Sequence, residues 1–154
     1  MAKQHHYKTL ITWTGNRGEG TSGYRNYDRA HIIQVENKEI IRASSDPAFL
    51  GDPSAHNPED LLLASLSSCH MLWYLHLCAD NGVVVLSYSD NAAGIMEENP
   101  NGGKFIEVTL HPVVKVAHPS IIGIATALHA QAHKKCFIAN SCNFPVKHEV
   151  NILV

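Results

Sequence analysis

Residues 57–82, NPEDLLLASLSSCHMLWYLHLCADNG, decide the fold because they contain the start and the stop of one long helix. Asn57 is a favoured residue for capping a first turn, and Pro58 suits the first helical position, where no backbone donor is needed. Gly82 readily adopts the left-handed conformation that is common just after a helix. The segment therefore predicts a helix that runs to about Ala79, with a cysteine and a histidine near its middle.

Beyond its acidic first turn, this predicted helix has no charged side chain. Residues 61–79 contain no Asp, Glu, Lys or Arg, a composition that also fits the length of a membrane span. The same residues include three serines, two histidines and two cysteines. A helix that is apolar nearly all round is equally typical of a protein core, so we expect a buried core helix and no membrane.

The residues on either side of this helix read mainly as strands and turns. Residues 1–50 hold short alternating strands separated by a glycine-rich connection. Residues 83–96 and 104–116 predict two long strands. A hairpin joins these two strands, because the proline and the paired glycines of residues 97–103 force the chain to reverse.

A second helix and a final strand complete the pattern. Pro119 opens the helix, which continues towards Lys135 with apolar residues along one face. Residues 145–154 then predict one strand. Strands and helices do not alternate as βαβ units, so the sequence predicts the α+β class, with residues 1–154 in a single domain.

The charge and composition of the chain exclude nucleic acid as a partner. The chain has 12 basic and 14 acidic residues, and its formal net charge is −2, without the basic patch that binds phosphate backbones. The first ten residues, MAKQHHYKTL, show neither a secretory nor an organelle-targeting pattern, so we expect a cytoplasmic location. Only 17% of residues are charged, which favours an oligomer that covers part of its surface.

The four cysteines are too few for a disulfide scaffold, so in a reducing compartment they are thiols unless they cycle in catalysis. Cys69 lies in the middle of the uncharged helix, whereas Cys78 lies on the opposite helix face and cannot pair with it. Cys136 and Cys142 lie near the end of the second helix, beside two lysines that give local positive charge. Either of them can be the second thiol of a redox pair.

Two other kinds of cysteine site fit the residues less well. His129, His133 and Cys136 form an H-x3-H-x2-C array, but a structural zinc site needs a fourth ligand, and no residue has a spacing that recommends it. We therefore predict no metal, and we interpret both histidines as exposed or partner-facing. A cysteine hydrolase needs a histidine in contact with its cysteine, and His70 points about 100° away from Cys69 on a helix.

Residues 57–82 strongly resemble the OsmC/Ohr family of hydroperoxide reductases, whose helix starts with NPE and carries the peroxidatic cysteine. Residues 12–31 look like the family's amino-terminal strands, 111–120 like the strand that enters the last helix, and 133–146 like the segment with the second cysteine. The resemblance implies antiparallel sheets packed around a long central helix that carries Cys69. It also implies an intertwined homodimer with two active sites at the subunit interface.

The family's functional residues are carried over position by position. Cys69 matches the peroxidatic cysteine, Cys136 the resolving cysteine and Glu59 the active-site glutamate. The family also uses an arginine that holds the thiolate, for which Arg17 is the first candidate and Arg29 the second. Just before NPE, where some members carry this arginine, the chain reads AFLGDPSAH, and no proline follows its second cysteine.

The spacing of Glu59 and Cys69 limits how these two residues act together. Ten helical residues place Glu59 about 15 Å from Cys69 along the axis. If Glu59 acts beside the thiolate, either the helix is broken or the other subunit supplies the glutamate.

The function that the resemblance implies is a cofactor-free thiol peroxidase of oxidative stress defence. Cys69 becomes a sulfenic acid, Cys136 resolves it, although Cys142 stays open for this role, and a dithiol of lipoyl or similar type restores both thiols. Apolar residues around Cys69, including Met71, Leu72 and Trp73, favour an organic hydroperoxide over hydrogen peroxide. The alternative is a non-enzymatic protein on the same fold that senses oxidants or binds a small apolar ligand.

Overall fold

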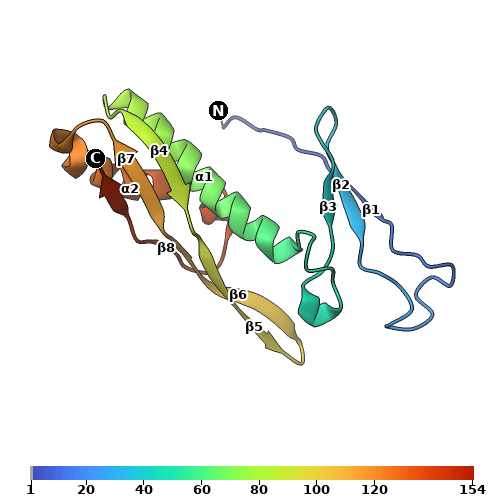
Figure 1. Cartoon of the computed structure of the whole chain (residues 1–154). Helices are drawn as coiled ribbons and strands as arrows, with labels where there is room; N and C mark the ends of the chain where they lie inside the picture. Colours follow the sequence, from blue (N-terminus) through green and yellow to red (C-terminus); the bar gives the residue numbers. More distant parts are fainter. Residues whose placement is uncertain (1) are drawn as a thin grey trace. The chain divides into compact units, whose positions relative to one another are not determined.

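The computed structural model describes residues 2–154, which form two compact units divided after Leu61 (Figure 1). Helices and short sheets occur together without βαβ repetition, so the predicted α+β class is confirmed. The prediction of a single domain stays a prediction. In chain order the elements are β1 (Leu10–Trp13), β2 (His31–Gln34), β3 (Ile41–Ala43), the 3-10 helix η1 (Pro47–Phe49), α1 (Pro58–Asp80), β4 (Val85–Asp90), β5 (Ala93–Asn99), β6 (Gly102–Leu110), β7 (Pro112–Val116), η2 (Pro119–Ile121), α2 (Ile122–Lys135), η3 (Ala139–Ser141), β8 (Val146–His148) and β9 (Asn151–Leu153).

Helix α1 begins and ends where its sequence signals predict. At its start, the Asp60 amide donates to Asn57 Oδ1 at 2.7 Å, and the Asn57 amide donates to Asp60 Oδ2 at 3.3 Å. This reciprocal pair satisfies backbone donors that the first turn leaves free. At its end, Gly82 has a φ of 68°, and the Asn81 side chain donates to the Leu77 carbonyl at 2.8 Å. The predicted cap and stop are both confirmed.

One stripe of α1 is buried. Leu66, Tyr74, Leu77 and Cys78 are buried together with His70. Their spacing of mostly three or four residues places them on one helix face. By length and composition α1 can also cross a membrane, but the core helix of a globular protein passes the same test. Core packing accounts for the buried stripe, whereas other apolar side chains of α1, such as Leu72, are exposed.

The two long strands expected in residues 83–96 and 104–116 are each broken into two, so this part of the sequence prediction is wrong. Strand β4 pairs with β7 and β5 pairs with β6, and both pairs are antiparallel. Asn91 and Ala92 interrupt the first strand, and His111 interrupts the second. The hairpin between β5 and β6 is confirmed.

Asp90 and Pro112 provide the physical reason for this break. Asp90 Oδ1 accepts a hydrogen bond from the His111 amide at 2.7 Å, and Asp90 Oδ2 accepts one from the Ser67 hydroxyl of α1 at 2.5 Å. The next residue, Pro112, has no amide hydrogen to donate to a ladder. One carboxylate therefore takes the place of a strand partner and ties the break to α1.

The strand expected at the end of the chain is also broken into two. Strand β8 lies parallel to β6 and β9 lies parallel to β7, and the Glu149 amide between them donates to the Leu110 carbonyl at 2.8 Å. Parallel pairing needs a crossover connection, which α2 provides between β7 and β8. The sheets therefore have the orders β4-β7-β9 and β5-β6-β8, which corrects the expectation of one strand in residues 145–154 and of wholly antiparallel sheets.

Helix α2 starts one turn after the proline that predicts it. Pro119 opens η2, where the Ser120 amide donates to His118 Nδ1 at 3.3 Å, and α2 follows directly. The helix ends at Lys135 as expected, with Lys134 and Lys135 in its last turn. Positive charge at this position is favoured by the helix dipole.

Two hydrophobic clusters form the core of the second unit, and α1 contributes to both. The larger cluster joins α1 to α2 and β7, and the smaller cluster joins α1 to β6, so the buried stripe of α1 is held along its length (Figure 1). Buried members of the larger cluster are Tyr74, Leu77, Cys78, Val83, Val114, Val116, Ala125, Leu128 and Ala132; those of the smaller cluster are Leu66, Val108 and Leu110.

The first unit contains one antiparallel sheet in the order β1-β2-β3. Trp13 Nε1 donates to the Asp28 carbonyl at 2.8 Å, and its ring meets that of Tyr27 edge-on at 5.8 Å. All four side chains of β1 are exposed, among them Leu10 and Ile11. An exposed apolar strand of this kind is typical of a surface that another chain covers.

The buried stripe can be tested at Leu66, whose side chain is 0% exposed in the smaller cluster. We expect L66A to lower the free energy of unfolding by about 2–5 kcal/mol, because the cavity left behind collapses only in part. The matched control is L72A, in the same helix but 62% exposed, for which we expect a change within about 0.5 kcal/mol. Urea denaturation followed by circular dichroism measures both, and equal losses would contradict this assignment of the core.

Candidate functional site

Two thiols from distant parts of the sequence meet in the second unit. Cys69 lies near the middle of α1, beside the buried stripe, and is partly exposed. Its thiol lies close enough to that of Cys136, the residue that caps the end of α2, to help raise the pKa of the Cys136 thiol. Both are free thiols. The packing of the two helices therefore creates a dithiol.

The two thiols differ in their access to solvent. Cys136 is 1% exposed, and burial raises its pKa to about 11, with the neighbouring Cys69 thiol adding to the effect. The Ala139 amide donates to Cys136 Sγ at 3.4 Å and acts in the opposite direction. At neutral pH, Cys136 is therefore a protonated thiol that is shielded from solvent. A dissolved reagent can reach only the partly exposed Cys69 sulfur.

The other two cysteines are engaged in packing. Cys78 belongs to the larger core cluster, and Cys142 packs against the smaller one. The Cys142 thiol donates to the Ile138 carbonyl at 3.3 Å, and burial raises the pKa of both Cys78 and Cys142. Of the two candidates for the second thiol, Cys136 is the one that meets Cys69.

Arg17, the first candidate for the activating arginine, is held by an acidic neighbour within the first unit. Its Nε donates to Asp28 Oδ2 at 3.0 Å, its Nη2 forms an ion pair with Asp28 Oδ1, and its Nη1 donates to the Arg25 carbonyl at 3.4 Å. The hydrogen bond from Arg17 lowers the pKa of the Asp28 carboxyl. Two-point contact of this kind fixes the orientation of the guanidinium plane.

Arg29, the second candidate, is held by two tyrosines of the same unit. Its guanidinium carbon lies 4.4 Å from the ring centroid of Tyr24 and 4.2 Å from that of Tyr27. Its Nη1 donates to the Tyr27 carbonyl and its Nη2 to the Tyr24 carbonyl, each at 2.7 Å. Both arginines are thus preorganised by neighbours, and the choice between them stays a prediction.

Glu59 lies in the first turn of α1 and is partly exposed. Because α1 is continuous from Pro58 to Asp80, ten residues of helix separate Glu59 from Cys69 by about 15 Å. The glutamate and the thiol of one chain therefore do not meet through a break in the helix. The role of Glu59 at the thiolate stays a prediction.

His129 is 0% exposed, so the interpretation of this residue as exposed or partner-facing is wrong. Its Nδ1 lies 3.0 Å from His70 Nε2, and the two ring planes differ by 14°, which places one N–H···N bond inside the core. The ring of Tyr74 stacks on His129 at 3.7 Å. A polar side chain in a helix is read as exposed from sequence, but here a second imidazole satisfies one ring nitrogen.

Two further histidines approach this buried pair without completing a metal site. The ring of His148 lies 5.6 Å from that of His70, and the ring of His133 lies 5.7 Å from that of His148. Within residues 2–154, no group of three or more His, Cys, Asp or Glu is arranged to hold a metal ion. Within the H-x3-H-x2-C array, His129 contacts His70 and Cys136 lies beside Cys69.

Burial makes the paired histidines hard to protonate. It lowers the pKa of His70 to about 4 and that of His129 to about 3. Positive charge on His148 or His133 lowers the pKa of His70 further, whereas Asp90 raises it. The pair is therefore neutral at neutral pH.

The sequence signal that could have indicated burial of His70 was spacing. His70 falls four residues after a buried leucine of α1 and four before a buried tyrosine.

Trp73, one of the apolar residues expected around Cys69, provides an aromatic contact beside the thiols. It lies one helical turn after Cys69, and its ring meets that of Phe137 edge-on with centroids 5.5 Å apart. A small hollow of about 230 Å³ on this side of α1 is lined by Leu72, Trp73 and His76. The i,i+4 spacing places Trp73 on the same flank of α1 as Cys69.

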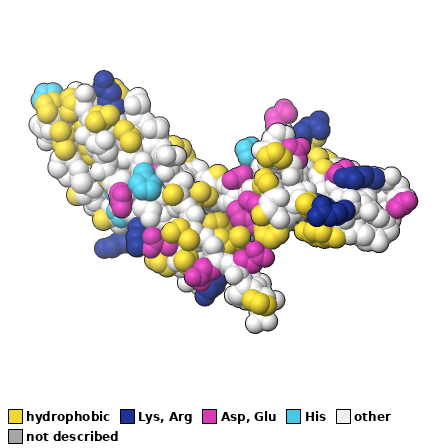
Figure 2. Space-filling view, turned by 60° about the horizontal axis from the view of Figure 1, so that its bottom comes forward, with side chains coloured by type: hydrophobic (Ala, Val, Ile, Leu, Met, Phe, Trp, Pro, Cys, Tyr) yellow, Lys and Arg dark blue, Asp and Glu magenta, His cyan; other side chains and the backbone are white. Residues whose placement is uncertain are grey.

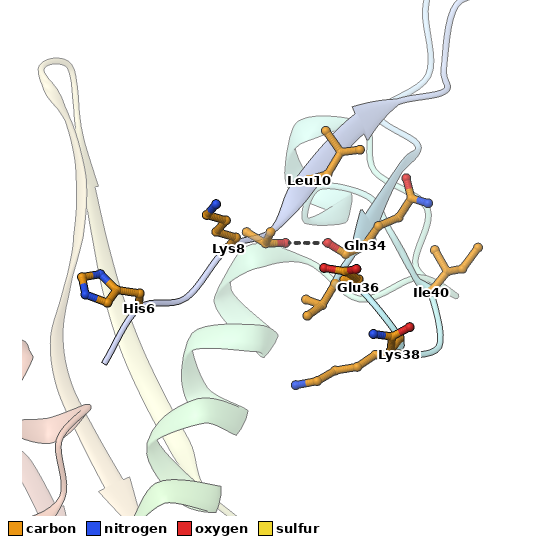
Figure 3. Close-up of a pocket in the computed structure, with 10 residues that line it drawn as sticks. His6, Lys8, Leu10, Gln34, Glu36, Lys38 and Ile40 are labelled. Carbon is orange, nitrogen blue, oxygen red and sulfur yellow. Dashed lines mark hydrogen bonds between the residues drawn. The ribbon is translucent and has the colours of Figure 1, made fainter. Parts of the chain in front are cut away.

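A wider hollow of about 790 Å³ lies in the first unit, between the N-terminal segment and the turn after β2 (Figure 3). Charged and apolar side chains alternate around it, and no cysteine is among them, so it offers no thiol chemistry. Its lining consists of His6, Lys8, Thr9, Leu10, Gln34, Val35, Glu36, Asn37, Lys38 and Ile40.

The amino-acid sequence matches the model of one protein family. A family model described as OsmC-like protein matches residues 51–151, a range that contains both thiols, α1 and α2. No curated protein matches the chain at a significant level.

Solved structures with the same fold cover nearly the whole chain. An OsmC-like protein of unknown function from Vibrio cholerae is 32% identical, with a TM-score of 0.84 over 96% of this chain and 99% of that one. An organic hydroperoxide resistance protein OsmC from Legionella pneumophila is 20% identical, with a TM-score of 0.69 over 98% of this chain and 100% of that one. An organic hydroperoxide resistance protein from Elizabethkingia anophelis is 18% identical, with a TM-score of 0.69 over 98% of this chain and 99% of that one. At their lower identities, the last two show the fold alone.

The buried histidine pair predicts that stability falls on acidification. Unfolded histidines bind a proton near pH 6.5, whereas folded His70 and His129 do so only near pH 4 and pH 3. The unfolded state therefore holds more protons below pH 6.5, and the stability that is present above this pH is lost as the pH falls towards 4. Each histidine contributes at most about 1.4 kcal/mol per pH unit, which urea denaturation at several pH values measures.

Two variants separate this effect from the titration of carboxylates. H129F removes one buried imidazole and keeps an aromatic ring stacked on Tyr74, so we expect a shallower pH slope. H76Q removes an imidazole whose side chain is 60% exposed and keeps the slope of the unmodified protein. If H129F and H76Q gave the same slope, the buried pair would not be the source of the acid sensitivity.

Proposed function

Since the chain belongs to the OsmC-like protein family, we propose that it is a thiol peroxidase that reduces organic hydroperoxides. The contact between the partly exposed Cys69 and the shielded Cys136 is the observation that carries the proposal. A reachable thiol can serve as the nucleophile, and a shielded thiol in contact with it can resolve the oxidised product.

In the first step, the Cys69 thiolate attacks the distal oxygen of the hydroperoxide. A sulfur–oxygen bond forms, the oxygen–oxygen bond breaks, and the remaining alkoxide takes up a proton and leaves as an alcohol. The peroxide is reduced by two electrons, and Cys69 is oxidised to a sulfenic acid. A cation beside the sulfur stabilises both the thiolate and the charge that develops on the leaving oxygen.

In the second step, Cys136 attacks the Cys69 sulfur. The disulfide forms, the sulfur–oxygen bond breaks, and the hydroxide leaves as water with the proton that Cys136 gives up. The sulfenic acid is electrophilic enough to be attacked as the Cys136 proton departs, and the existing contact removes the need for a large movement.

In the third step, a dithiol reduces the disulfide by two exchange reactions and is itself oxidised to a cyclic disulfide. All electrons come from this reductant, so no cofactor enters the reaction. A lipoyl-type or similar dithiol suits the proposal, because its second thiol attacks within the same molecule. The apolar residues of α1 next to Cys69, Met71 among them, favour organic hydroperoxides as substrates. We place the protein in the cytoplasm, where such dithiols stay reduced.

The activating groups are proposed to come from a second copy of the chain. In the proposed homodimer, the partner subunit's Glu59 orients an arginine, Arg17 or Arg29, at the Cys69 thiolate. The exposed apolar side chains of the described residues support such an assembly (Figure 2). In the first unit the large ones are Tyr7, Leu10, Ile11, Trp13, Tyr24, Ile40, Ile41 and Leu50.

Substitution of single cysteines tests the assigned chemistry. We expect C69S to consume no peroxide above the blank, because it lacks the nucleophile. C136S should consume one equivalent per Cys69 and then stop, because its sulfenic acid has no resolving thiol. C142S is the matched control and should turn over like the unmodified protein. Peroxide consumption with a dithiol reductant measures all three, and sustained turnover by C136S would contradict the resolving role. If the unmodified protein were oxidised once and not reduced again by the dithiol, it would be a sensor.

Mixed dimers test where the glutamate comes from. We expect E59Q and C69S to be nearly inactive alone but to recover activity when the two are refolded together. In a mixed dimer with exchanged glutamates, one of the two sites combines an intact Cys69 with an intact Glu59. If each chain used its own Glu59, both sites would stay impaired and no activity would return.

A further inference from the structure

The segment that carries Cys136 is held on α1 by one aromatic residue. Trp73 lies four residues after Cys69, so the two side chains share a flank of the helix. Its ring meets Phe137 edge-on, with centroids 5.5 Å apart and planes at 87°. On the other side of Cys136 in the sequence, Lys135 Nζ lies 5.3 Å from the centroid of the same ring. The residues before and after Cys136 therefore both contact Trp73.

Cys136 needs such support because regular structure ends there. It is the C-cap of α2 with φ −66° and ψ 108°, and two residues separate it from η3. Its amide donates to the His133 carbonyl at 3.2 Å, which closes the helix, and the chain then turns. Phe137 is 66% exposed, so its contact with Trp73 is not part of the hydrophobic core. An edge-to-face pair and a cation over an indole face are both attractive at such distances.

We propose that Trp73 is a positioning residue that holds Cys136 against Cys69 and so sets the effective concentration of the resolving thiol. Trp73 touches no reacting atom in this scheme and acts through Phe137 and Lys135. The inference rests on the proposed function for its kinetic consequence. During resolution the sulfur–sulfur bond forms between Cys69 and Cys136 as water leaves, and Trp73 keeps the Cys136 segment in place throughout.

The first measurement does not require peroxidase activity. Reduced proteins are equilibrated with a series of reduced and oxidised glutathione ratios, and the fraction of the Cys69–Cys136 disulfide is read by alkylation and mass spectrometry. We expect W73A and F137A to shift this equilibrium towards the dithiol by about 2- to 10-fold, the range for loss of one aromatic pair. W73F keeps an edge-to-face partner and should recover most of the effect.

The second measurement separates the two oxidation steps. After one equivalent of an organic hydroperoxide is mixed with the protein, peroxide consumption reports sulfenic acid formation, and disulfide formation is followed by quenched alkylation. We expect W73A to change the rate of sulfenic acid formation by less than about 2-fold. The same substitution should slow disulfide formation by about 2- to 10-fold. K135Q should slow the second step in the same way, whereas K134Q, which changes the neighbouring exposed lysine, should not.

The outcomes distinguish this inference from the proposed function. Unchanged glutathione equilibria in W73A and F137A would overturn the positioning role, whatever the peroxidase activity. If W73A slowed both oxidation steps equally, Trp73 would act on peroxide reduction as well as on resolution, and the inference would fail. If the unmodified protein consumed no peroxide, the peroxidase proposal would be overturned. If W73A still formed the Cys69–Cys136 disulfide in glutathione less readily than the unmodified protein, the positioning role would be supported.

Discussion

Leu66, His70 and Tyr74 lie one above another on α1 and face the core, and this choice of buried face determines where the reactive groups of the helix point. Because successive helical residues are rotated by about 100°, burial of His70 turns Cys69 and Trp73 to an adjacent flank. That flank meets the end of α2 and the segment after it. A change in the rotation of α1 would bury the reactive thiol or separate it from Cys136.

The sequence predicted the parts of the fold that depend on local signals. The cap at Asn57 and the stop at Gly82 form within a few residues, so their chemistry is readable without the rest of the chain. The break at Asp90 was not readable, because it depends on hydrogen bonds to Ser67 and to the His111 amide, which are distant in sequence. Strand propensity alone predicts that the strand continues past Asp90.

The candidate site shows the same division between local and distant information. Resemblance to a family identified Cys69 and Cys136, and the packing of α1 against α2 places them in contact. The burial of His129 could not be predicted, because its partner His70 lies on another helix. The choice between Arg17 and Arg29 also stays a prediction, because local sequence patterns do not show which side chains meet the thiolate.

The parallel pairing of β8 and β9 has a consequence for the order in which the protein is made. Both strands follow α2 in the chain, yet they complete the sheets begun by β6 and β7. A growing chain therefore releases Cys69 from the ribosome well before the strands that close its core have been synthesised. Long-range pairing of this kind also forms slowly. During that interval the nascent thiol is more accessible than in the folded protein.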